Sequence, residues 1–115
     1  MNFGTFLLMQ SPSARSSTEI YARAVEMAQA AESLGFSNIW LAEHHFSTYG
    51  YLSRPLQLAT YLAGRTTRIR VGTAVIVVPL HHPLVVAEEI ATLALDAATR
   101  QRLTVDNARQ FLALE

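Results

Sequence analysis

Three short apolar segments alternate with three segments of helical periodicity along this chain, and this alternation restricts the fold more than any other feature. The apolar segments are Phe3–Met9, Asn38–Ala42 and Ile69–Val78. Strands that alternate with helices in this way lie parallel and are joined by right-handed crossovers. Continuous apolar runs are typical of parallel strands that are buried on both faces. The sequence therefore predicts an α/β fold made of parallel (β/α) units.

The first helix carries clear boundary signals. Ser16 and Glu19 have the spacing of a capping box, in which each side chain bonds the backbone of the other residue. Apolar residues then recur at three- and four-residue intervals as far as Leu34, and Gly35 stands where the residue after a helix often takes a positive φ. We expect a helix over Ser17–Leu34.

The later helices are marked by prolines, and the end of the chain departs from the alternation. Pro55 and Pro83 suit the first turns of the second and third helices. A fourth strand would be due after Asp96, but Thr104–Leu114 shows helical periodicity instead. We expect a single domain over residues 1–115, with (β/α) units over 1–95 and a divergent helical tail over 96–115.

Length and composition exclude several classes of protein. A complete (β/α)₈ barrel needs about 250 residues, so these 115 residues are too few for one. The formal net charge is zero, which leaves no electrostatic footprint for nucleic acid or an anionic membrane. The absence of cysteine excludes disulfides and thiolate chemistry. With no long apolar run and no signal-peptide pattern, we expect a soluble cytoplasmic protein.

Polar residues follow the predicted strands at the end of the sheet where parallel folds bind ligands. All the histidines of the chain lie there, in Glu43-His44-His45 and His81-His82. One hypothesis is general acid/base catalysis by a histidine that Glu43 orients or tunes. A metal site is disfavoured, because adjacent histidines on a strand point to opposite faces and no His-x-His spacing occurs. The remaining alternative is that these are loop histidines with local hydrogen bonds.

Small residues interrupt the third apolar segment at Gly72-Thr73-Ala74. Glycine weakens a strand unless another group approaches its backbone closely. Two interpretations are open: the small residues leave room for a flat ligand, or a helix packs tightly over them.

Several of these motifs together resemble the N-terminal part of the bacterial luciferase-like flavin monooxygenase family, in its luciferase and alkanal monooxygenase branch. The resemblance spans roughly residues 1–95 and rests on blocks with similar spacing: Phe3-Gly4-Thr5-Phe6, Gly35-Phe36, Ile39-Trp40-Leu41-Ala42-Glu43-His44-His45-Phe46, Val71-Gly72-Thr73-Ala74-Val75, His82-Pro83 and Glu88-Glu89. Beyond Asp96 the family continues with a Gly-Arg turn and further strand–helix units, whereas this chain has Thr99-Arg100.

The resemblance implies a (β/α)₈ barrel enzyme that binds reduced FMN, usually delivered by a separate flavin reductase. By this resemblance we expect the chain to form a partial TIM barrel of about three (β/α) units. Such enzymes use oxygen to oxidise a small organic substrate such as an aldehyde. By the same resemblance, His44 is the catalytic histidine and Glu43 lies near the flavin ring. Ala74 and Val75 match a stretch that carries a non-proline cis peptide against the flavin. The family's phosphate-binding residues lie beyond the matched part.

Two readings of the whole chain stay open. In one, the chain is part of an FMN-dependent monooxygenase with His44, Glu43, Ala74 and Val75 at its site and no metal. In the other, it is a non-catalytic assembly module that dimerises through the second and third helices, which the resemblance permits. Both readings are compatible with a homo-oligomer, and neither requires a nucleic acid or membrane partner.

Overall fold

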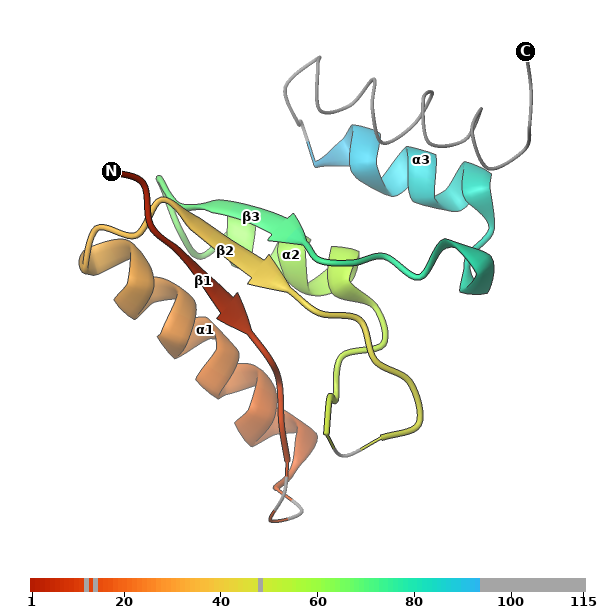
Figure 1. Cartoon of the computed structure of the whole chain (residues 1–115), viewed down its shortest axis with the longest axis horizontal. Coiled ribbons are helices and arrows are strands. Elements are labelled where there is room, and N and C mark those ends of the chain that lie inside the picture. Colours follow the sequence, from red (N-terminus) through yellow and green to blue (C-terminus); the bar gives the residue numbers. More distant parts are fainter. Residues whose placement is uncertain (12, 14, 48, 94–115) are drawn as a thin grey trace. The chain divides into compact units, whose positions relative to one another are not determined.

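The structure is a computed structural model that describes residues 1–11, 13, 15–47 and 49–93, and it confirms the predicted alternation (Figure 1). The elements in chain order are β1 (Gly4–Leu7), α1 (Ser17–Ser33), β2 (Asn38–Leu41), α2 (Pro55–Ala63), β3 (Arg70–Thr73), the 3₁₀ turn η1 (Val78–Leu80) and α3 (Pro83–Thr92). The chain divides into two compact units at residues 76 and 77. The predicted helical tail over 96–115 lies outside the described residues.

The first unit, Met1–Ile76, contains a three-stranded sheet in the order β1-β2-β3. Both pairings are parallel, as predicted, and all three arrows in Figure 1 point the same way. The strands are shorter than the apolar segments that predicted them. The reason is that β2 ends at Leu41, whose partners are Leu7 and Thr73. Beyond these two residues, β1 and β3 have no neighbouring strand to pair with.

The two faces of this sheet differ in burial, which corrects the expectation of strands buried on both faces. Leu7, Ile39 and Leu41 share one face and are 0–3% exposed. On the opposite face, Phe6 and Trp40 are 53% and 43% exposed. Consecutive crossovers of the same hand return the chain along one side of a sheet. The burial pattern accordingly places α1 and α2 on the face of Leu7, Ile39 and Leu41.

Trp40 explains the small residues of β3. A Cβ added to Gly72 would lie 2.7 Å from Cζ3 of Trp40, and one added to Gly4 would lie 3.2 Å from its Nε1. The indole therefore lies across the backbones of both neighbouring strands on the exposed face. The close neighbour that the sequence left open at Gly72 is this side chain.

The helix signals of the sequence are confirmed. The Ser16 hydroxyl accepts a bond from the Glu19 backbone N–H, and the Glu19 carboxylate accepts one from the Ser16 backbone N–H. Gly35 takes a φ of +87° just after α1. Pro55 and Pro83 stand at the starts of α2 and α3. These local signals set the helix boundaries. The apolar sides of the helices are buried in the core, among them Ala24, Ala28, Leu58 and Leu62.

One carboxylate fastens the amino-terminal end of β3 to α1. Oε1 of Glu32 accepts backbone N–H bonds from Thr67, Arg68 and Ile69 at 2.9, 2.5 and 2.8 Å. The guanidinium of Arg68 donates in return to the Glu32 carbonyl. These bonds hold the pKa of Glu32 below its ordinary value, with the Ile69 N–H as the largest cause. The Glu32 carboxylate thereby holds three successive backbone N–H groups at the start of β3.

The helices in the described part of the chain lack the combination of length and hydropathy that crossing a bilayer requires.

Candidate functional site

The predicted site residues of the first unit meet at the carboxyl end of the sheet. Glu43 and His44 follow β2 directly, and Ala74 and Val75 follow β3. The Ala74 backbone N–H donates to the Leu41 carbonyl at 2.8 Å, which continues the link between β2 and β3 by one residue. This bond keeps the two segments side by side as they leave the sheet. In parallel α/β folds, this is the end at which ligands bind.

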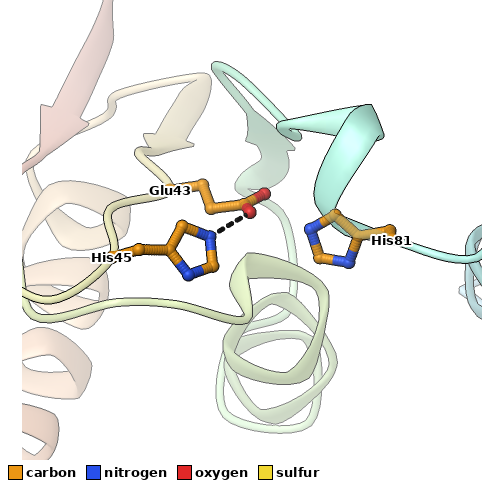
Figure 2. Close-up of side chains that lie close together, drawn as sticks. All are labelled: Glu43, His45 and His81. Carbon is orange, nitrogen blue, oxygen red and sulfur yellow. Dashed lines mark hydrogen bonds and ion pairs between the residues drawn. The ribbon is translucent and has the colours of Figure 1, made fainter.

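Glu43 bonds the ring of His45 (Figure 2). Nε2 of His45 lies 2.6 Å from Oε1 of Glu43, and the Glu43 side chain is fully buried while that of His45 is 24% exposed. A carboxylate only accepts hydrogen bonds, so an ionised Glu43 requires that Nε2 of His45 be the donor. Sequence reasoning predicted that Glu43 orients a histidine without deciding which one. The structure shows that the oriented ring is that of His45.

His44 packs against the loop that follows it. Its backbone N–H donates to the Leu52 carbonyl at 2.8 Å, and its ring meets the Tyr49 ring edge-on, with centroids 5.7 Å apart. A Cβ added to Gly50 would lie 2.2–2.6 Å from Cδ2, Cγ and Cβ of His44. The imidazole thus lies directly on the Gly50 backbone. The sequence marked Tyr49 and Gly50 only as loop residues, because no pattern along the chain signals this contact.

The same loop is tied to the end of β1 and the start of α1. The Tyr51 backbone N–H donates to the Met9 carbonyl at 2.7 Å. The Tyr51 hydroxyl and the Ser17 hydroxyl are 2.7 Å apart and share a hydrogen bond. Because Met9 lies just beyond β1 and Ser17 opens α1, the loop that carries His44 is anchored to two elements besides its own strand.

The peptide bond between Ala74 and Val75 is cis, as the resemblance implied. Val75 is 63% exposed, so its side chain offers apolar surface at the end of β3. The structure therefore brings an apolar segment and a half-buried imidazole to the same end of one sheet.

The other polar residues that follow the strands have local contacts or lie in the second unit. Ser11 is 4% exposed, and its hydroxyl accepts the Arg15 backbone N–H. His81 and His82 stand between η1 and α3 in the second unit. His82 is the N-cap residue of α3, where its backbone carbonyl accepts the Val86 N–H and its side chain makes no cap bond.

Comparison with known proteins gives a consistent result. The sequence model of a family described as luciferase-like monooxygenase matches residues 1–105. An alkanal monooxygenase alpha chain of Photorhabdus laumondii is 43% identical over 93 residues, which cover 81% of this chain and 26% of that protein. A luciferase-like monooxygenase of Escherichia coli K12 is 35% identical over 91 residues, covering 79% of this chain and 27% of that protein. The chain thus spans about a quarter of the length of these curated relatives.

A solved structure shares the fold. The oxygenating constituent of 3,6-diketocamphane monooxygenase of Pseudomonas putida, in complex with FMN, superposes with a TM-score of 0.76 at 22% identity. The match covers 81% of this chain and 26% of that one. The three-stranded parallel sheet with its helices therefore has the fold of about a quarter of that longer chain.

Proposed function

This chain belongs to the luciferase-like monooxygenase family, and from that premise we propose that it forms the flavin-facing amino-terminal part of an FMN-dependent monooxygenase. In this function, reduced FMN and oxygen oxidise a small organic substrate such as an aldehyde. The observation that carries the proposal is that His44 and the Ala74–Val75 segment follow two neighbouring parallel strands at the carboxyl end of the sheet.

The residues at this end suit the ring portion of FMN. A flavin ring needs a flat apolar wall, a group that handles a proton, and protection from water. Ala74 and the exposed Val75 offer apolar surface at the end of β3. His44 is half-buried, and imidazole is the side chain used most often for general acid–base catalysis. The described side chains therefore match two of these requirements in kind, the apolar wall and the proton-handling group.

Each residue has a distinct role in this proposal. FMN would supply the electrons that activate oxygen. His44 exchanges a proton with the reacting atoms, while Ala74 and Val75 form the wall. Glu43 acts through His45: its buried carboxylate fixes that ring and with it the start of the loop. The reduced flavin is provided by a separate flavin reductase in the cytoplasm.

The proposal is tested by titrating the chain with FMN and following flavin fluorescence, and then by measuring aldehyde oxidation with a reductase that supplies reduced FMN. Wild-type protein should quench the flavin saturably and turn over. His44→Ala should keep the binding and lose turnover, whereas His82→Ala, which changes an exposed histidine of the second unit, should keep both. Absence of saturable binding by the wild type would overturn the proposal. Full turnover by His44→Ala would remove His44 from its role.

An assembly module is the second candidate, and exposed apolar residues around α3 favour it. Leu80, Leu84 and Val85 are 55%, 70% and 48% exposed. Clustered apolar surface of this kind often marks association sites. Light scattering separates the candidates: a defined homo-oligomer without flavin binding supports the module alone, and a monodisperse monomer of 12.7 kDa contradicts it.

A further inference from the structure

Gly50 stands in a backbone conformation that does not itself call for glycine. Among the described residues, the glycine with positive φ is Gly35, and Gly50 lies outside that region. A side chain at position 50 is nevertheless blocked, since its Cβ would lie 2.2 Å from Cδ2 and 2.3 Å from Cγ of His44. The requirement for glycine comes from the imidazole that lies on it.

The surroundings leave the loop little room to accommodate a Cβ. The His44 N–H bonds the Leu52 carbonyl at one end of the loop, and the Tyr51 N–H bonds the Met9 carbonyl beyond β1. Gly50 itself is buried between these two bonds. A Cβ added there must therefore displace the His44 ring or break one of these backbone bonds.

Tyr49 makes a second contact with the His44 ring. Its ring stands at 88° to the imidazole, with centroids 5.7 Å apart, an edge-to-face arrangement that aromatic rings favour. Gly50 thus meets the imidazole through its backbone, and Tyr49 meets it ring to ring. Together these two contacts restrict the rotation of a side chain that the backbone alone would leave free.

We propose that Gly50 and Tyr49 form a seat that fixes the orientation of the His44 imidazole, with Gly50 as a positioning residue. This inference deepens the proposed function. It rests on that function only where it gives His44 a part in proton transfer. Holding a proton-transfer group in one orientation matters because a displacement of about 1 Å can cost roughly 100-fold in rate.

The primary test is the NMR spectrum of the histidine side chains in the full chain. Gly50→Ala should shift the ring resonances of His44 and leave those of His82 in place. Tyr49→Ala should shift the same His44 resonances by less. Gly64→Ala is the matched control, because Gly64 has a φ of −78° and an added Cβ would meet its nearest neighbour at 3.6 Å. Unchanged His44 resonances in folded Gly50→Ala would overturn the proposal.

A second variant covers the case in which Gly50→Ala fails to fold. His44→Gly removes all three side-chain atoms that crowd the new Cβ. If the contact is the cause, the double variant His44→Gly/Gly50→Ala should be more stable than Gly50→Ala, as measured by thermal melting. A double variant that is no more stable would show that Gly50 serves the loop and not the ring.

Turnover provides a readout that separates this inference from the proposed function. With reduced FMN supplied, Gly50→Ala should lower kcat about 100-fold and leave FMN binding unchanged. The NMR test requires no flavin, so failure of the wild type to bind FMN would overturn the proposed function and leave the seat intact. Wild-type kcat in Gly50→Ala would show that the seat has no catalytic consequence.

Discussion

Glu32 and Glu43 stand at opposite ends of the same sheet and use their carboxylates in different ways. Glu32, at the amino end of β3, accepts three successive backbone N–H groups. Glu43, beyond the carboxyl end of β2, is fully buried at its side chain and bonds the ring of His45. The first carboxylate holds backbone, and the second orients a side chain that could take part in chemistry.

The difference indicates that the Glu32 end of this unit serves structure, whereas the Glu43 end positions side chains for function. At the Glu32 end, the fixed groups are main-chain atoms that every sequence possesses, so the contact sets where β3 begins. At the Glu43 end, the fixed groups are imidazoles, whose value lies in proton transfer. This division is typical of (β/α) enzymes, in which the carboxyl face of the sheet reacts and the amino face stabilises. The predictions below probe how far the two ends are independent.

The largest effect should come from the core that both ends share. Leu41 is fully buried and ends β2, so Leu41→Ala should lower the free energy of unfolding by about 2–5 kcal/mol. The contacts of Glu32 and those of Glu43 should be lost in one transition during chemical denaturation. Phe6→Ala, on the exposed face of the sheet, is the control and should cost less. An equal loss in the two variants would contradict the division of the sheet into a buried and an exposed face.

The next largest effect should come from the amino end. Glu32→Ala removes the acceptor of three backbone N–H bonds and should lower the melting temperature without moving the His44 ring resonances. Glu26→Ala, which removes an exposed carboxylate from the same helix, is the matched control and should change little. A shift of the His44 resonances in Glu32→Ala would show that the two ends are coupled.

The Glu32 end should also respond to acid. The backbone N–H of Ile69, followed by that of Arg68, lowers the pKa of Glu32 in the folded chain below its ordinary value of 4.5. A carboxyl group whose pKa is lower in the folded chain than in the unfolded chain stabilises the fold at pH values above its unfolded-state pKa. This stabilisation is lost as the pH falls through its folded-state pKa. Glu32→Gln should therefore flatten the loss of stability below about pH 4.5. An unchanged acid limb of the stability curve in Glu32→Gln would contradict this assignment.

Sequence reasoning succeeded where the determining contacts are local. The capping box of Ser16 and Glu19, and the prolines at positions 55 and 83, placed the helix starts correctly. It was less successful for the strands, because the length of β1 and β3 is set by where β2 ends. The exposed face carrying Trp40 was also missed, since apolar residues alone do not tell which side a helix will cover.

At the site, the sequence located the residues but not their partners. Glu43 and His44 were predicted at the carboxyl end of the second strand, and they lie there. The pairing of Glu43 with His45, and of His44 with Gly50, depends on how the loop turns. Phe46 adopts a φ of +52°, which is uncommon for a residue other than glycine. Nothing in the local sequence marks this conformation, so the contacts that follow the turn could not be predicted.

The smallest effect should come from the start of α1, which lies at the same end as the candidate site. Ser16→Ala removes the hydroxyl that accepts the Glu19 N–H and donates to its carboxylate. Loss of such a cap costs about 1 kcal/mol, and Ser16→Thr should retain most of the stability.

Because Ser17 shares a hydrogen bond with Tyr51, fraying of this turn should reach the loop that carries His44. Hydrogen exchange should therefore speed up at the first turn of α1 and at the Tyr51 N–H in Ser16→Ala, while the Ile69 N–H stays protected by Glu32. Faster exchange at Ile69 as well would mean that the cap stabilises the whole unit. The two ends would then differ in chemistry but not in local stability.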